Sequence, residues 1–301
     1  MHIPETNAWD ALEDGNDLTR LKTLVVRSVP GLKCLQLHSC TALEELTINC
    51  ESLVQLEGLQ SLGSLERLEL IYTPGLESLQ LHSCTALEEL RIRRCRSLTA
   101  LEGLQSLGRL KKLVVEWSPG LESLQLHSCT ALEELTITYC GPLIQPEGLQ
   151  YLGRLRHLAV YGCPDLGPCL ELFPQLEKLE TDNPSVLTMS FCYHHTTLRR
   201  LKLYHLVLSE EQGRALVLLT SLQELEFNDC PSLLDLPAGL HLLPSLKRLK
   251  ISYCQRISRL PETGLPLSLE ELEISYCSKE LDDQWKGLAT SKLRVTIKEC
   301  W

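Results

Sequence analysis

The chain has 301 residues, of which 44% are hydrophobic and 5% aromatic, and its formal net charge is −10. Plentiful and evenly spread apolar residues exclude a disordered chain, and no apolar run approaches the roughly 18 residues of a membrane span. The acidic balance argues against a general binder of nucleic acid or of anionic membranes. Sixty-nine leucines indicate one structural unit that is used many times.

Residues 1–17 show no repeat and are predicted to be a lead-in to a repeat domain that spans 18–301. The lead-in lacks a basic stretch followed by an apolar run, so no signal peptide is expected. It offers no recognisable cap, and Leu12, Leu18 and Leu21 would leave an apolar edge open. Because solenoids need covered ends, we expect the chain to be the later part of a larger protein.

From residue 18 onward the sequence repeats itself. The segment Leu-Gln-Leu-His-Ser-Cys-Thr-Ala-Leu-Glu-Glu-Leu occurs three times, at 35–46, 79–90 and 124–135. A second segment, Gly-Leu-Gln-Ser-Leu-Gly, occurs at 58–63 and 103–108 and, with one Tyr for Ser, at 148–153. The long period is therefore 44–45 residues.

A shorter period of 21–24 residues lies inside the long one. The pattern Leu-x-x-Leu-x-Leu/Ile/Val predicts thirteen inner strands, whose first inward residues are Leu24, Leu46, Leu68, Leu90, Leu113, Leu135, Leu158, Leu179, Leu201, Leu225, Leu249, Leu272 and Val295. This spacing matches the leucine-rich repeat, in which one short strand per coil lines a horseshoe. The predicted fold is an α/β solenoid of about 13 coils with a parallel concave sheet. Its convex side is expected to mix short strands, turns and helices.

Two kinds of coil are expected to alternate on the convex side. Extended segments are predicted at 35–40, 79–84 and 124–129, because an interval of eleven residues is too short to close a coil. The other coils carry the Gly-Leu-Gln-Ser-Leu-Gly segment, which predicts a short turn or helix. Between Cys163 and Leu225 the pattern loosens, and 209–212 (Ser-Glu-Glu-Gln) reads as a capping box that starts a helix running to about Leu219. A last helix is predicted over 278–288.

Cysteines recur five residues after the first strand leucine, as at Cys95, Cys140 and Cys254. Leucine-rich repeats place Asn or Cys at this buried bend, where a small thiol fits. A periodic ladder does not supply the paired geometry that disulfides require. We therefore interpret these residues as structural thiols in a reducing compartment, the cytosol or the nucleus.

No motif predicts catalysis or cofactor binding. The Gly103–Gly108 spacing of a phosphate loop is followed by Arg109-Leu110 rather than Lys-Ser/Thr, so it is not a nucleotide site. His38, His82 and His127 recur on every second coil, about 10 Å apart, which is too far for shared metal ligation. The chain is expected to be no enzyme and to bind no metal or cofactor.

Residues before each strand leucine alternate in charge along the array, as in the succession Glu88-Glu89, Lys111-Lys112, Glu133-Glu134. In a parallel sheet such residues are lateral neighbours, so opposite charges can join one coil to the next. A local excess of positive charge occurs at 91–96, and Glu69 and Glu116 are expected to neutralise part of it. A nucleic-acid partner is not expected.

Aromatic residues gather just past the strand core, at the third and fourth residues after the first leucine. Exposed aromatics on a rigid concave surface typically anchor protein interfaces. The alternative is that these rings pack on neighbouring rings and stiffen the turn; the sequence leaves both open. With two arginines of the basic cluster, the candidate protein-binding residues are Tyr72, Arg91, Arg93, Trp117, Tyr139, Tyr161, Tyr204, Tyr253 and Tyr276.

The repeat resembles a known family. The stretch 236–254, from Leu-Pro-Ala-Gly-Leu to Leu-Lys-Ile-Ser-Tyr-Cys, resembles cytosolic plant leucine-rich repeats. The stretches 264–277 and 291–297 resemble the C-terminus of nucleotide-binding leucine-rich-repeat immune receptors of grasses. This resemblance implies a sensor domain that recognises a pathogen effector protein and restrains the nucleotide-binding module of the same receptor.

The alternative function is the substrate-receptor subunit of a ubiquitin ligase, which is also leucine-rich and of the cysteine type. Those arrays usually have a period nearer 26 residues and carry an N-terminal F-box. Neither feature is visible in this sequence. A metabolic enzyme is disfavoured by the lack of a catalytic constellation.

Overall fold

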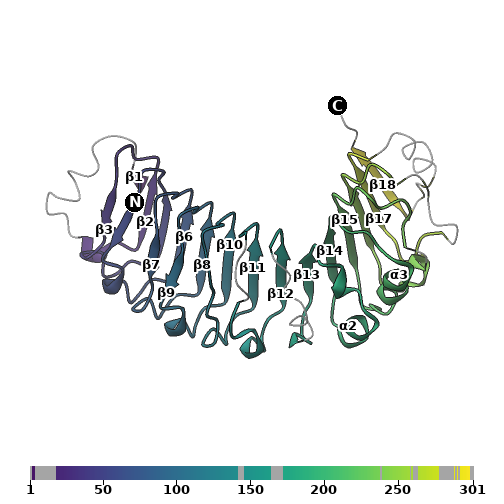
Figure 1. Ribbon diagram of the computed structural model, residues 1–301, viewed down its shortest axis with the longest axis horizontal. Coiled ribbons are helices and arrows are strands. Elements are labelled where there is room, and N and C mark those ends of the chain that lie inside the picture. The colour runs from purple at the N-terminus through teal and green to yellow at the C-terminus, as the bar shows by residue number, and fades with distance from the viewer. Residues whose placement is uncertain are drawn as a thin grey trace. The chain divides into compact units, whose positions relative to one another are not determined.

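The computed structural model describes residues 2–3, 18–141, 146–163, 172–237, 239–257, 259, 264–277, 288, 290 and 292–298. The chain divides into two compact units. The first unit comprises Met1–Leu155 with Gly162–Leu166, and the second comprises Arg156–Tyr161 with Gly167–Trp301. Each unit is built around its own set of parallel inner strands (Figure 1).

The inner strands of the first unit lie in the order β1-β2-β4-β6-β8-β10-β11. Their bounds are β1 His2–Ile3, β2 Thr23–Arg27, β4 Glu45–Asn49, β6 Arg67–Ile71, β8 Glu89–Arg93, β10 Lys112–Glu116 and β11 Glu134–Thr138. They pair in parallel with leucine beside leucine, as for Leu68 and Leu90. All the strands predicted here are confirmed, and β1 is an addition: it pairs with β2 along the edge that the sequence left open.

The inner strands of the second unit follow in the order β12-β13-β14-β15-β16-β17-β18. Their bounds are β12 His157–Tyr161, β13 Lys178–Thr181, β14 Arg200–Tyr204, β15 Glu224–Asn228, β16 Arg248–Ser252, β17 Glu271–Ser275 and β18 Arg294–Lys298. Each contains its predicted leucine or valine. The leucine-rich-repeat solenoid is therefore confirmed.

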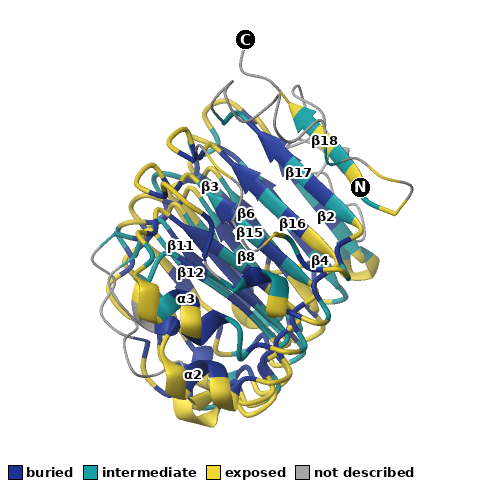
Figure 2. Cartoon of the chain, turned by 90° about the vertical axis from the view of Figure 1, so that its right-hand side faces the viewer, coloured by how far each residue is buried: buried dark blue, intermediate teal, exposed yellow. Residues whose placement is uncertain are grey.

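Burial along the strands follows the two-residue period. In β4, Leu46 and Ile48 are buried, whereas Glu45, Thr47 and Asn49 are partly exposed. The same banding is visible on β17 in Figure 2. Burying one such leucine contributes about 1.5–3 kcal/mol, and the leucines of one coil can be covered only by the coils on either side.

The outer side of the first unit carries two short parallel sheets. In one, β3 (Cys34–Gln36) pairs with β5 (Gln55–Glu57), and in the other β7 (Ser78–Gln80) pairs with β9 (Ala100–Glu102). The first two predicted extended segments are thus confirmed in their first residues, whereas 124–129 has only an isolated bridge from Gln125 to Glu147. The partner strands come from the other type of coil, which the sequence predicted as turn or helix alone. A short 3-10 helix follows in each of those coils, at Leu59–Ser61, Leu104–Ser106 and Leu149–Tyr151.

Gly103 lies at a close contact between coils of the two types. Its backbone is left-handed, with φ of 88°, and a Cβ atom there would lie 2.4 Å from the backbone nitrogen of His82. A glycine is therefore required where the 3-10 helix of one coil meets the outer strand of the previous coil. Gly58 and Gly148 repeat this close approach against His38 and His127.

Short helices replace outer strands in the loosened part of the second unit. α2 (Met189–His194) begins at Thr188, whose hydroxyl accepts a hydrogen bond from the amide of Phe191. α3 (Glu210–Leu216) has the predicted capping box between Ser209 and Gln212, but it ends before Leu219. Figure 2 shows exposed residues on both helices. Most of the helix predicted over 278–288 lies outside the described residues.

Candidate functional site

Five of the seven candidate aromatic residues lie at a turn with an unusual backbone, one residue past an inner strand, whereas Tyr161 and Tyr204 are the last residues of β12 and β14. Among the residues that the structure describes, nine that are not glycine have φ between 48° and 57° there, and we call them the left-handed row: Ser28, Tyr72, Arg94, Trp117, Tyr139, His205, Asp229, Tyr253 and Tyr276. This conformation costs roughly 1–2 kcal/mol per residue that carries a Cβ. The fold therefore imposes the turn, and side chains of several kinds occupy it.

Hydrogen bonds between coils hold the left-handed row in place. The amide of Tyr72 donates to the carbonyl of Arg93 at 2.8 Å, and the amide of Trp117 donates to the carbonyl of Thr138 at 2.9 Å. The parallel ladder thus continues one residue beyond the strand. The turn then leads inward to a buried residue, such as Ser118 after Trp117.

In the first unit, some of the aromatic rings pack on neighbouring rings and others are exposed, so both alternatives for the aromatic pattern occur. Trp117 stacks on Tyr139 with ring centroids 4.0 Å apart, yet Trp117 is 51% exposed. The ring of Tyr139 also leaves no room for a side chain at position 162, because a Cβ on Gly162 would lie 2.5 Å from its Cδ1 atom. Tyr72 is 39% exposed. Tyr139 therefore acts as packing, whereas Tyr72 and Trp117 present surface.

A shallow hollow lies between Tyr72 and Trp117. Its lining residues come from the ends of four neighbouring inner strands and the turns after them: Asn49, Ile71, Tyr72, Arg93, Arg94, Glu116 and Trp117. A second hollow, lined by Ser28, Glu51 and other residues, adjoins Tyr72. Tyr72 thus separates two depressions along one edge of the first unit.

Two of the four arginines in 91–96 are paired. Arg93 Nε lies 2.9 Å from Glu116 Oε2, as expected, whereas Arg91 pairs with Glu89 on its own strand at 2.5 Å rather than with Glu69. Arg94 and Arg96 are exposed and make no side-chain ion pair or hydrogen bond within the described part of the chain. The sequence singled out Arg91 and Arg93, but Arg94 and Arg96 carry the available charge.

The rings of the second unit differ in exposure. Tyr161 and Tyr204 stack at 4.0 Å, and Tyr204 is only 8% exposed. Its hydroxyl lies 3.3 Å from Glu180, and burial raises its pKa. The expectation of an exposed ring is therefore wrong for Tyr204, since the neighbouring ring covers it. Tyr253 is 50% exposed and stacks on Tyr276 at 4.8 Å.

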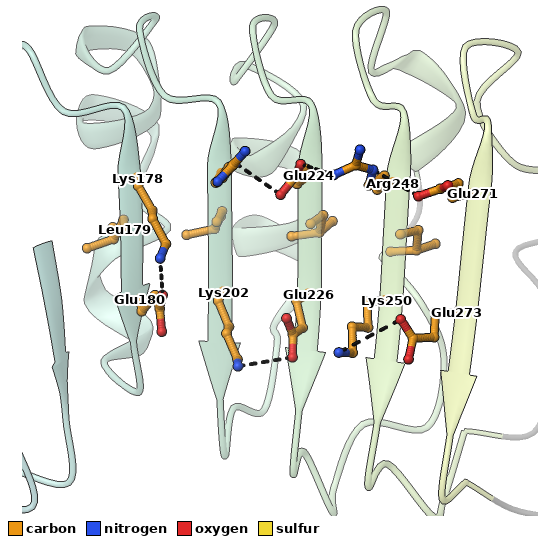
Figure 3. A pocket seen from close by; sticks show the side chains of 14 residues that line it. Lys178, Leu179, Glu180, Lys202, Glu224, Glu226, Arg248, Lys250, Glu271 and Glu273 are labelled. Atoms are coloured by element: carbon orange, nitrogen blue, oxygen red, sulfur yellow. Dashed lines mark hydrogen bonds and ion pairs between the residues drawn. The ribbon is translucent and has the colours of Figure 1, made fainter. Parts of the chain in front are cut away.

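The concave wall of the second unit is a lattice of ion pairs (Figure 3). Basic strands β14 and β16 alternate with acidic strands β15 and β17. Arg248 reaches Glu224 at 2.6 Å and Glu271 at 2.9 Å, on the strands to either side. Lys202 reaches Glu226 at 3.1 Å in the row below. The predicted linking of coils by charges is confirmed, and each exposed pair contributes about 0–1 kcal/mol.

The same lattice shifts the titration of one carboxylate. The pKa of Glu273 is lowered, first by the hydrogen bond from Lys298 at 2.7 Å and further by the charge of Lys250. A partner that approached this wall would have to displace such internal partners. The wall is therefore better suited to holding coils together than to attracting a charged ligand.

The cysteine ladder joins neighbouring coils through its thiols. The Sγ atom of Cys140 donates to the carbonyl of Val115 at 3.4 Å, and that of Cys254 donates to Phe227 at 3.8 Å. Burial raises the pKa of Cys84 to about 11 and that of Cys192 to about 12. Nine of the twelve cysteines that the structure describes are buried, which confirms the assignment as buried structural thiols for most of them.

Within the described residues, no three His, Cys, Asp or Glu side chains are grouped so that they could hold a metal ion. No helix in the described part of the chain combines the length and the apolar character that crossing a membrane requires.

These features define a leucine-rich-repeat protein whose outward groups are edge aromatics and unpaired arginines. Residues 116–255 match a family model described as leucine-rich repeats of plant disease resistance protein RPS2-like type. This match supports a leucine-rich-repeat domain of the plant immune-receptor type. No curated protein sequence matches the chain.

One solved structure supports the same fold. An internalin, InlF from Listeria monocytogenes, has 18% sequence identity and a TM-score of 0.52, with 93% of this chain and 87% of that chain covered. The leucine-rich-repeat domain of the type III effector XopL has 26% identity and a TM-score of 0.44, with 86% and 78% covered. The InlF likeness shows the fold alone.

Sequence reasoning did not predict the left-handed row, although a signal was present. The fourth residue after the strand leucine is Gly162 in one coil, Asp229 in another and His205 in a third. Glycine, aspartate and histidine are enriched where φ is positive. Their recurrence at one repeat position would have predicted the turn on which the aromatic residues lie.

Proposed function

We propose that this chain is the protein-binding sensor domain of a plant disease-resistance receptor. In this proposal it recognises a pathogen effector protein and helps to restrain the nucleotide-binding module of the same receptor. The match of residues 116–255 to plant resistance-protein repeats carries the proposal. The chain would act in the cytosol or nucleus by binding rather than by catalysis.

The geometry supports a binding role at the sheet edge. Trp117 and Tyr253 are each about half exposed and sit on turns that hydrogen bonds fix in place. Fixed, exposed aromatic residues lose little conformational freedom when a partner covers them, which is why they dominate binding energies.

Co-purification with candidate pathogen proteins tests effector recognition. Replacement of Tyr72, Trp117 and Tyr253 by Ala is expected to abolish capture while the far-ultraviolet circular dichroism stays unchanged. Tyr151→Ala is the matched control, because Tyr151 is 51% exposed but lies on an outer 3-10 helix. Equal loss in the control, or unfolding of the triple variant, would refute edge recognition.

The second half of the proposal requires a different measurement. The purified nucleotide-binding module of a plant receptor should bind this domain, and the captured effector should weaken that binding. Capture of a ubiquitin-ligase adaptor instead of that module would favour the alternative function of a ligase substrate receptor.

A further inference from the structure

We propose that the hollow between Tyr72 and Trp117 binds an acidic segment of the partner protein, with Arg94 as the residue that selects its charge. This inference rests on the proposed function as a protein-binding domain and names the chemistry that one edge of the first unit recognises. We call this site the Arg94 hollow; its lining residues are those given above.

The three principal residues occupy the same repeat position on consecutive inner strands. Tyr72, Arg94 and Trp117 follow β6, β8 and β10, and all three have the left-handed backbone. At the strand spacing of about 4.8 Å, Arg94 stands between two exposed aromatic residues roughly 10 Å apart. This span suits one or two side chains of an extended segment.

The charge of the hollow is not balanced from within. Glu116, the acidic residue in its lining, is already paired with Arg93 at 2.9 Å. Glu51 lies beside the Tyr72 hydroxyl and lines the neighbouring hollow instead. Arg94 is therefore left with an uncompensated positive charge, and Arg96 adds a second exposed one. A guanidinium group binds carboxylates through two parallel hydrogen bonds, which favours Asp or Glu in the partner.

The corresponding turns of the second unit lack this arrangement. There Asp229 follows β15, and its carboxylate lies 3.3 Å from the ring nitrogen of His205 on the preceding turn. The charged side chains of these two turns are thus close enough to pair with each other. The whole chain has a net charge of −10, whereas the Arg94 hollow is locally positive. The hollow can therefore bind acidic segments in preference to basic ones.

The test uses the full chain and a short fluorescein-labelled peptide in which glutamate alternates with valine. Fluorescence anisotropy should show binding that weakens as salt rises, and no binding of the matching lysine–valine peptide. Arg94→Glu should weaken binding at least about tenfold, and Trp117→Ala by a similar factor, as for central anchor residues. Arg94→Lys, which keeps the charge, should lose less.

Arg154→Glu is the matched control, since Arg154 is exposed, lies in the first unit and has no side-chain ion pair within the described residues. Equal weakening by Arg154→Glu, equal binding of the lysine peptide, or no binding up to about 1 mM peptide would overturn the inference. Binding of a short oligothymidylate that Arg94→Glu abolishes would also overturn it, by assigning the hollow to nucleic acid.

The same variants separate this inference from the proposed function. If wild type and Arg94→Glu capture a pathogen protein equally, the proposal of effector recognition is supported. The inference that the Arg94 hollow binds an acidic segment of that protein is then wrong. If the glutamate peptide binds as described and no pathogen protein is captured, the hollow stands and effector recognition fails.

Discussion

A substitution at Gly103 tests whether the backbones of neighbouring coils approach each other as closely as the structure shows. The perturbation is Gly103→Ala, compared with Gly108→Ala at the other end of the same repeated segment. At Gly103 a methyl group would lie 2.4 Å from His82 N and 2.8 Å from Leu81 C, both backbone atoms. At Gly108 the nearest atom is Ser128 O at 4.0 Å, and φ is not positive.

The magnitude follows from these two environments. A left-handed alanine costs about 1–2 kcal/mol, and a clash with backbone that cannot rotate away costs about 1–3 kcal/mol more. Alanine also lowers the conformational entropy of the unfolded chain, which stabilises the folded state by about 0.4–1 kcal/mol. Gly103→Ala should therefore lower the free energy of unfolding by about 1–5 kcal/mol, whereas Gly108→Ala should leave it within about 0.5 kcal/mol or raise it slightly.

Urea unfolding followed by far-ultraviolet circular dichroism measures the difference. Because repeat arrays can lose cooperativity, the midpoints of the two variants should be compared at equal slope. Equal midpoints for Gly103→Ala and Gly108→Ala would refute the close approach of the two coils at Gly103.

Three further predictions concern charges and thiols. Reversing Lys111 and Lys112 to Glu, which removes their pairs with Glu88 and Glu134, should lower the melting temperature more at low salt than at high salt; equal loss at both would contradict the lateral pairing. The lowered pKa of Glu273 contributes stability that is present above the ordinary glutamate pKa of about 4.3 and is lost as the pH falls through the lower folded value. Glu273→Gln should therefore reduce the loss of stability between neutral and acidic pH, and an unchanged pH profile would refute the shift. Cys84, with its pKa near 11, should resist iodoacetamide at pH about 8 until urea is added; rapid labelling of the folded chain would contradict its burial.

The regular part of the fold was predictable because one residue type marks it. Thirteen strand positions follow from the leucine period, since an inward side chain recurs whenever a coil closes. β1 was missed because two paired residues leave no periodic pattern. α2 was missed because its six residues are too few for an amphipathic repeat, and its stability comes from the buried Phe191 and Cys192.

The candidate site was predictable in part. Clustering of aromatic residues at two adjacent repeat positions found the end of the strand and the turn after it. The sequence could not tell exposed Trp117 from buried Tyr204, because the burial of Tyr204 depends on Tyr161, which lies two strands away. Nor could it tell which arginines are free. Arg93 is paired by Glu116, whereas the side chain of the adjacent Arg94, whose backbone is left-handed, is exposed.

Site-specific photo-crosslinking tests the central proposal, recognition of a pathogen protein at the sheet edge, most directly. A benzophenone side chain is placed at position 117 on the inner edge or at position 151 on the outer 3-10 helix, and the captured pathogen protein is irradiated with each. Crosslinks from position 117 and none from position 151 are expected. Crosslinks from position 151 alone would place the partner on the outer side and contradict recognition by the aromatic edge.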